Sequence, residues 1–417
     1  MPVFDAVAYL RTVGERWEPD DYEPGVLCNP VLAATAAALV AVDAITLGRA
    51  QAIIGGYSPA PAPGADRSHL TGVRAAEDAA SPPPDIGRLR VVPCDRVIDQ
   101  PWGRLTIRYV VFTDHATSLR VTLRPDESQA RQPGHRIAAQ ARRVSITDAR
   151  GTTAVAEFSG GFRHGELDWH GQYEARPPLA ADTPWIGVLG EQVQLTAEPV
   201  SSRAWAEPLP AQDPAVRHLW ERVATLNDFH NPHLALEATI AALAAAGAIP
   251  ADGSVAGAAR VAAAVLRPDG VSTGGVPGDL PGPWHALVAR WGQTGGPVAT
   301  IPVGAITPSF DGVTVAVIAL ESLYEHFSIS VELVPQVRTG LPYRDLPAQQ
   351  HLTWWAADNL GNYYLGEQGS WDPRGGRGRG TIGFWPALDP RASSIDLMPT
   401  ATTARAVIRL PLPRTGH

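Results

Sequence analysis

Apolar residues recur in the same order in the two halves of the chain. Asn29-Pro30 begins an Ala-rich apolar run, and Asn231-Pro232 begins a similar run about 200 residues later. Proline is tolerated in the first turn of a helix and asparagine caps helix starts, so both runs predict helices. Asp43 and Arg49 interrupt the first run, which is then too short to span a membrane. We expect a buried helix of small residues there.

After each predicted helical segment, the spacing of apolar residues changes from one typical of helices to the alternation typical of strands. Residues 105–112 and 119–123 alternate and are rich in β-branched side chains, and so are residues 313–320 and 327–333. This pattern predicts two strands in each half. The two pairs end at Pro125 and Pro335.

Tight turns and further strands follow in both halves. Asp148 is followed by Gly151, and Asp358 is followed by Gly361, between segments that read as strands. An aspartate caps such a turn and a glycine accepts its positive φ. Six or seven short strands within about 100 residues are typical of an immunoglobulin-like antiparallel sandwich.

A gapless match supports an internal duplication. Residues 171–188 align with residues 380–397, pairing Gly171 with Gly380 and Pro177 with Pro386. We therefore predict an α+β, mainly β, protein with two immunoglobulin-like antiparallel β-sandwich domains, each preceded by a small α-helical segment. The predicted segments are 1–90 (helical, with a Pro/Gly-rich linker), 91–205 (sandwich), 206–300 (helical, with a linker) and 301–417 (sandwich).

Composition limits the function classes. The chain has 417 residues and a net charge of −8, which disfavours a protein that binds nucleic acid through phosphate neutralisation. All 34 basic residues are arginine. The two cysteines, Cys28 and Cys94, make no disulfide framework, and the N-terminus has no basic leader, so we expect a cytoplasmic protein.

One candidate site lies in the first half. His164, Glu166, Asp168 and His170 alternate and would project from the same face of a strand. Imidazole and carboxylate groups are ligands for zinc or a similar divalent metal. Same-face residues lie about 6.6 Å apart, so only neighbours could share one ion. The alternative is a solvent-exposed polar loop or strand face, without a cofactor.

A second candidate site lies in the second half, which is rich in tryptophan and arginine. Exposed tryptophans can bind sugars or partner proteins. Adjacent Trp354 and Trp355 must point to opposite faces of a strand, so one of them is a candidate for exposure or an interface. The arginines lie in a Gly-rich stretch that also resembles RNA-binding RGG segments, although a hairpin loop explains it equally. The candidate partner-binding residues are Trp354, Trp355, Trp371, Arg374, Arg377 and Arg379.

Residues 42–50 (Val-Asp-Ala-Ile-Thr-Leu-Gly-Arg-Ala) resemble the helical core of HEPN-type bundles found in bacterial conflict systems. The ribonucleases of that family carry an arginine followed closely by a histidine on one helix. Neither helical segment of this chain has that pair, so the resemblance implies a non-catalytic member.

Two functional hypotheses follow. The first is a non-enzymatic scaffold that binds another protein or itself, because catalytic motifs such as G-x-S-x-G, Walker A and H-E-x-x-H are missing from the sequence. The second is an enzyme or ligand-binding protein with its site at the junction of the two halves, using a metal held by the cluster from His164 to His170. We expect no membrane partner, and a nucleic-acid partner is disfavoured.

Overall fold

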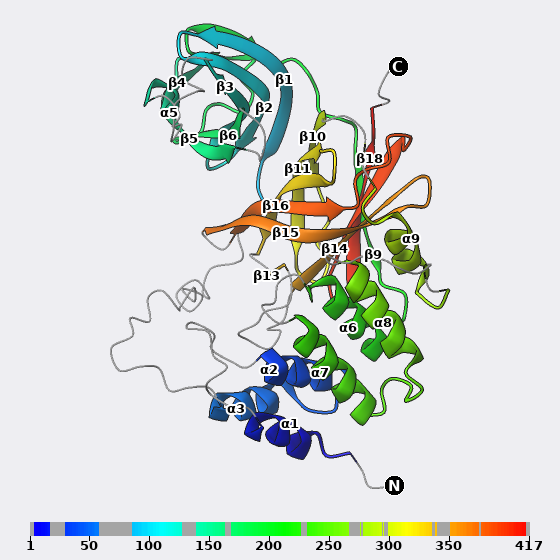
Figure 1. The fold of residues 1–417 in the computed structure, drawn as a ribbon. Helices are drawn as coiled ribbons and strands as arrows, with labels where there is room; N and C mark the ends of the chain where they lie inside the picture. Colours follow the sequence, from blue (N-terminus) through cyan, green and yellow to red (C-terminus); the bar gives the residue numbers. More distant parts are fainter. Residues whose placement is uncertain are drawn as a thin grey trace.

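The protein consists of a helical bundle and two large antiparallel sheets, with the second sheet between the bundle and the first sheet (Figure 1). The predicted mainly β composition is confirmed. The computed structural model describes residues 4–16, 30–57, 86–126, 139–162, 168–226, 232–266, 276, 278–293, 295, 299–335, 338–339, 351–374 and 377–413.

The helical bundle combines helices from both halves of the chain. A single apolar core joins residues of both helical segments. The helices are α1 (Ala6–Glu15), α2 (Pro30–Ala41), α3 (Leu47–Tyr57), α6 (Pro214–Ala224), α7 (Pro232–Ala245), α8 (Ser254–Val265) and α9 (Gly282–Arg290).

Helices α2 and α7, which begin at the two predicted prolines, pack on each other. Ala34 and Ala235 are both buried at this contact, where small side chains let the helices approach closely. α2 is almost entirely apolar and mostly buried, as expected for a buried helix, whereas α7 has an exposed face that carries Glu237. The predicted caps Asn29 and Asn231 lie outside the described residues.

The first sheet, sheet A, is formed by the first half. Its strands pair in the order β1-β2-β3-β6-β5-β4-β7-β8. Their bounds are β1 (Leu89–Gln100), β2 (Gly103–Thr113), β3 (Thr117–Pro125), β4 (Arg143–Asp148), β5 (Thr153–Phe162), β6 (Trp169–Ala175), β7 (Trp185–Val188) and β8 (Glu191–Gln194), with the short α5 (Ala139–Arg142) before β4.

The second sheet, sheet B, repeats this order. Its path is β10-β11-β12-β16-β15-β14-β17-β18, extended by β9. The bounds are β9 (Arg203–Pro208), β10 (Ala299–Ile306), β11 (Thr314–Ser322), β12 (Phe327–Val334), β14 (His351–Asp358), β15 (Tyr363–Arg374), β16 (Arg377–Trp385), β17 (Ser394–Thr400) and β18 (Ala404–Pro411), and β13 (Arg338–Thr339) pairs with β14.

The predicted tight turns are present in both sheets. Asp148 Oδ1 accepts hydrogen bonds from the backbone N–H groups of Arg150 and Thr152, both at 2.9 Å. Asp358 Oδ1 does the same for residues 360 and 362, at 2.9 and 3.0 Å. Gly151 and Gly361 have φ of 81° and 84°, the left-handed conformation that favours glycine.

Each sheet curls around its own core. β1 contacts β8 at the two ends of sheet A, and β9 contacts β10 at the two ends of sheet B. The two large antiparallel sheets are therefore nearly barrel-like, with opposite walls that face each other as sandwich layers do. The predicted immunoglobulin-like type is not confirmed, because strand pairing runs along each sheet without a break.

The bundle is attached to sheet B through α9. The rings of Trp284 and Trp355 meet edge to face at 5.2 Å between centroids, and Arg290 Nη1 donates to the Tyr364 hydroxyl at 3.1 Å. Within the described part of the chain, we find no helix with the length and apolar character that a membrane crossing requires.

Candidate functional site

An apolar contact between sheets A and B is formed by β1 and β2 of the first sheet and β11 of the second. Val91, Tyr109 and Val111 of sheet A form an apolar cluster with Ile318 and Ala319 of sheet B. All five are at most 3% exposed. An outward-facing apolar residue on a sheet is stabilised when a second surface covers it, so the contact keeps the two barrels together.

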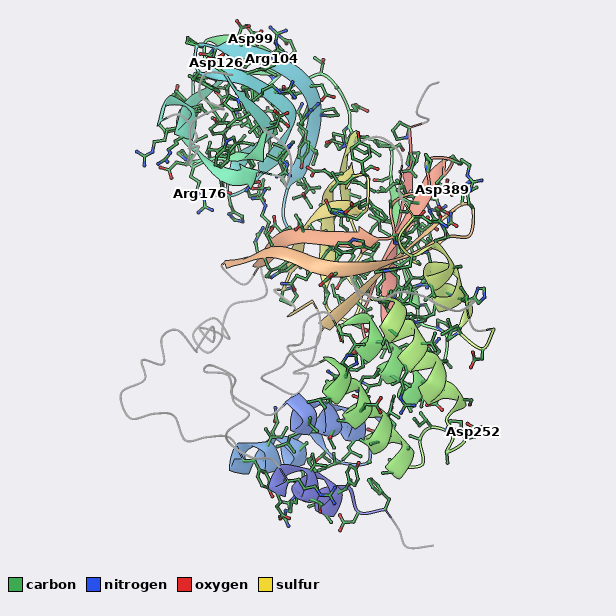
Figure 2. The ribbon with its side chains drawn as sticks, viewed as in Figure 1. Asp99, Arg104, Asp126, Arg176, Asp252 and Asp389 are labelled. Carbon is green, nitrogen blue, oxygen red and sulfur yellow. The ribbon has the colours of Figure 1, made fainter. Side chains whose placement is uncertain are left out.

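A buried ion pair also joins the sheets. Arg120 on β3 donates from Nε to Glu321 Oε1 at 3.0 Å and from Nη2 to Oε2 at 3.2 Å. The side chains are 24% and 10% exposed. Burial alone would lower the pKa of Arg120, but Glu321 and Tyr109 outweigh it and raise that pKa. By contrast, Arg104 and Asp99 pair on the exposed surface at the end of sheet A away from sheet B (Figure 2).

A second polar contact crosses the junction next to this pair. Arg379 on β16 lies 3.4 Å from Glu174 Oε2 and 3.4 Å from Ser118 Oγ, both on sheet A. Glu174 also pairs with Arg176, at 2.6 Å. The guanidinium of Arg379 is thus held between two strands of the other sheet.

These contacts surround a cavity of about 580 Å³ between the sheets. Tyr109, Arg120, Gln172 and Ser159 line it from sheet A, and they form one cross-strand row over β2, β3, β6 and β5. Because neighbours in register on a sheet share a face, the strand pairing alone aligns these four polar groups. The lining from sheet B includes Ser330, Thr381, Ser370 and Trp371.

The cavity has a buried floor and an open rim. Tyr109 and Val331 are at most 3% exposed, whereas Ser159 and Ser370 are exposed. Burial, the largest cause, raises the pKa of Tyr109 to about 12. Its hydroxyl, which hydrogen-bonds Ser330, therefore stays protonated at neutral pH. A volume in this range, with a few placed polar groups, is typical of small-molecule sites.

The predicted metal cluster is only partly brought to this site. His170 lines the cavity, and its Nδ1 lies 3.4 Å from Thr122 Oγ1. Both carboxylate oxygens of Asp168 accept from Arg124 at 2.8 Å. His164 and Glu166 lie outside the described residues. No group of three or more potential ligands is close enough for a metal among the side chains that are described.

The predicted arginines of the second half lie at the junction. Arg379 and Trp371 line the cavity, and Arg377 Nη1 donates to Glu332 at 2.8 Å and to the carbonyl of Ile86 at 3.3 Å. The side chain of Arg374 is outside the described part. Arg377 and Arg379, both on β16, therefore form ion pairs with carboxylates of the same chain.

Gly378 and Gly380, which flank Arg379, have a structural cause. A Cβ at either position would collide with the indole ring of Trp371. The packing of Trp371, a residue of β15, against β16 therefore explains these two glycines.

Trp354 and Trp355 point to opposite faces of β14, as predicted. Trp354 is 2% exposed in the core of sheet B, and Trp355 packs against Trp284 of α9. Trp354 therefore belongs to the core of sheet B, and the partly exposed Trp355 lies at the contact between sheet B and α9. Their role in binding a partner stays a prediction.

Sequence reasoning missed the main residues of the junction: Tyr109, Arg120, Glu174 and Glu321. A signal was present, because residues 109–112 and 315–320 are almost uninterruptedly apolar instead of alternating. β11 is buried along both faces. A continuous apolar run on a strand indicates that both faces are covered.

Comparisons with known proteins add no function. No protein-family profile matches the chain, and no curated protein is significantly similar. One solved structure, described as "The crystal structure of the conserved domain protein from Bacillus anthracis", is 10% identical, with a TM-score of 0.19, over 75% of this chain and 78% of that chain. At that TM-score the likeness carries no argument about fold or function.

Proposed function

We propose that this chain is a ligand-binding protein whose site is the cavity between sheets A and B. The observation that carries the proposal is the cavity of about 580 Å³, with a buried floor and a polar row contributed by four adjacent strands. The site lies at the junction of the two halves, where duplicated architectures offer two walls to one ligand.

Binding without catalysis fits the electrostatics of the lining. Arg120 is held by Glu321, and Glu174 is held by Arg176 and Arg379. The charged groups of the lining are thus already engaged in ion pairs within the protein, so they suit holding the walls in place better than exchanging protons with a ligand.

The test uses variants at the exposed rim, where a large side chain does not disturb the core. Ser159→Trp should close the cavity, whereas Val155→Trp, on the same face of the same strand but outside the cavity, is the matched control. Native mass spectrometry of the purified chain, and thermal shift in the presence of a cell metabolite extract, should show a ligand for wild type and for Val155→Trp. The same measurements should show none for Ser159→Trp. Ligand-free wild type that no extract stabilises would refute the proposal.

A non-enzymatic scaffold is the second proposal. It is favoured by the continuous attachment of the bundle to sheet B and of sheet B to sheet A, which supports a rigid body able to present surfaces to another protein or a second copy. Since Trp354 is buried in the core of sheet B, this proposal requires the partly exposed Trp355 or a different surface. A monomer by light scattering that binds a small molecule and co-purifies with no protein would count against it.

We further propose that the two halves arose by internal duplication of a helix-plus-sheet unit. Three features support the duplication. The two sheets have the same strand order, each has an aspartate-capped turn at the same place in that order, and α2 of the first half packs on α7 of the second. An immunoglobulin-like ancestry of the sheets and a divalent metal at the cluster from His164 to His170 remain hypotheses. Metal analysis of wild type and of a double variant, His164→Ala with His170→Ala, tests the metal.

A further inference from the structure

The chemical character of the cavity lining identifies a class of ligand. Hydroxyl groups come from both sheets: Ser159 and Tyr109 from sheet A, and Ser330, Ser370 and Thr381 from sheet B. Hydroxyls donate and accept hydrogen bonds, so such a surface matches a ligand that does both at many positions.

Charges in the lining have partners within the protein. Arg120 and Arg379 each bond to a carboxylate, at 2.9 Å and 3.4 Å for the closest oxygens. An anionic ligand bound to Arg120 would compete with Glu321, whose side chain is 10% exposed, and would leave that carboxylate buried without Arg120. Glu174 would keep Arg176 as a partner. Because separating a buried ion pair is strongly unfavourable, the Arg120 side of the lining disfavours an anionic ligand.

The cavity also has a small apolar surface, which comes from a few named side chains. Val111, Ile318 and Val331 lie at the floor, and Trp371 lines the wall while its ring packs over Gly378 and Gly380. An indole offers an apolar surface with a polar N–H and suits a ring whose faces carry C–H groups. A long hydrocarbon ligand would instead desolvate the polar groups of Ser159 and Gln172 without offering them hydrogen bonds.

We propose that the cavity binds a neutral polyhydroxylated molecule of the size of a mono- or disaccharide. The inference rests on the proposed ligand-binding function and specifies its ligand. Gln172 is the residue on which it depends most, because its amide lies in the middle of the polar row, between Arg120 and Ser159 in register.

Isothermal titration of the full chain with four kinds of probe tests this inference. Glucose, trehalose and myo-inositol represent the proposed class, inorganic phosphate and citrate represent anions, spermidine represents cations, and 1-octanol represents apolar ligands. A neutral probe should bind, and its Kd should be unchanged between low and high NaCl, because no net charge is neutralised.

Two variants separate cavity binding from surface binding. Gln172→Leu should weaken binding of the sugar or cyclitol by about 3- to 10-fold, the effect of one hydrogen bond. Gln194→Leu, an exposed glutamine on β8 outside the cavity, should leave the Kd unchanged. An equal effect of both variants would overturn the assignment of the ligand to this cavity.

The outcomes distinguish the inference from the proposed function. If only phosphate or citrate binds, with a Kd that rises with salt, or only 1-octanol or spermidine binds, the ligand class is wrong and the cavity remains a binding site. A native ligand that is charged or lacks hydroxyls would likewise overturn the class alone. Failure of every probe, together with ligand-free protein and no response to the metabolite extract, overturns both.

Discussion

The indole ring of Trp371 lies over two positions of β16 and leaves room only for glycine there. Gly380 faces Trp371 and the carbonyl oxygen of Ser370, and a Cβ at this position would collide with both. We expect Gly380→Ala to lower the free energy of unfolding by about 1–3 kcal/mol, because the backbone and ring must shift apart. Urea denaturation followed by tryptophan fluorescence measures this change.

Gly257 provides the matched control. It lies inside α8, and a Cβ there would meet no atom within 4 Å. Gly257→Ala should leave stability unchanged or raise it by up to about 1 kcal/mol, the difference in helix propensity. If both alanine variants behave alike, the close packing of Trp371 is not the cause.

Asp389 is expected to make stability depend on pH in the acid range. Hydrogen bonds from Arg391 are the largest cause that lowers its pKa from 3.8 to about 2. Since the folded-state pKa lies below the unfolded value, the stabilisation is present above the unfolded pKa and is lost as the pH falls through about 2. Asp389→Asn should cost about 1–3 kcal/mol at neutral pH.

A series of thermal unfolding curves checks this prediction. The difference in Tm between wild type and Asp389→Asn should shrink as the pH falls from about 4 to about 2. A constant difference over that range would show that Asp389 acts by packing and not through its charge.

At the residue level, the sequence predicted hydrogen bonds within turns better than contacts between residues that are far apart in the sequence. Asp148 and Asp358 form the expected turns with their glycines because the backbone N–H groups that their Oδ1 atoms accept from lie within four residues. Arg379 and Trp371 were chosen for a surface role, yet their contacts are with the same chain. Arg379 contacts Glu174 and Ser118, which are more than 200 residues away in the sequence, and local patterns do not specify such contacts.

Individual elements depend on neighbours from the other half of the chain. Ala235 on α7 is fully buried against α2, in a core shared by both helical segments. Ala235→Leu should destabilise the bundle by about 1–3 kcal/mol, because the added atoms have no space between the helices. Circular dichroism during urea unfolding measures the effect.

The adjacent residue gives the comparison. Leu234 is 52% exposed on the same helix, so Leu234→Ala should change stability by no more than about 0.5 kcal/mol. A larger loss for Leu234→Ala than for Ala235→Leu would contradict the observed face of α7.

The elements themselves were largely predictable. Helices starting at Pro30 and Pro232 and strands over residues 105–112 and 327–333 follow from apolar periodicity, which is a local property. The pairing of α2 with α7 was not predicted, because an all-apolar helix shows that it is buried and does not show by which element.

The whole molecule depends on the junction between the sheets. Arg120→Met leaves Glu321 buried without its cation, and we expect a loss of roughly 3 kcal/mol. The double variant with Glu321→Gln should lose less than the sum of the single variants, because no charge is left unpaired. A double-mutant cycle in urea measures this coupling.

The exposed pair of Arg104 and Asp99 is the control for that cycle. Its side chains are 54% and 72% exposed, so the coupling should not exceed about 1 kcal/mol. Equal coupling in both cycles would mean that Arg120 and Glu321 do not hold the sheets together.

At this scale, the sequence predicted a junction between the two halves as one possible place for a site, and the structure has a cavity there. A site at the junction of the halves was one of two expectations, and His170, Trp371 and Arg379 lie there. Tyr109, Arg120 and Gln172 were not predicted, because the sequence does not show which surface an outward-facing strand residue contacts. That surface is known only once the packing of the two sheets is known.

The shared core of the bundle has a consequence for synthesis of the chain. Sheet A, from β1 to β8, contains all of its pairing partners once residue 194 has been made, so it can fold while synthesis continues. Helices α1 to α3 precede it but complete their core only with α6 to α9, which emerge from the ribosome later. The apolar α2 therefore waits without its partner during translation, and a nascent chain stalled before α7 is the form most exposed to aggregation and most in need of a chaperone.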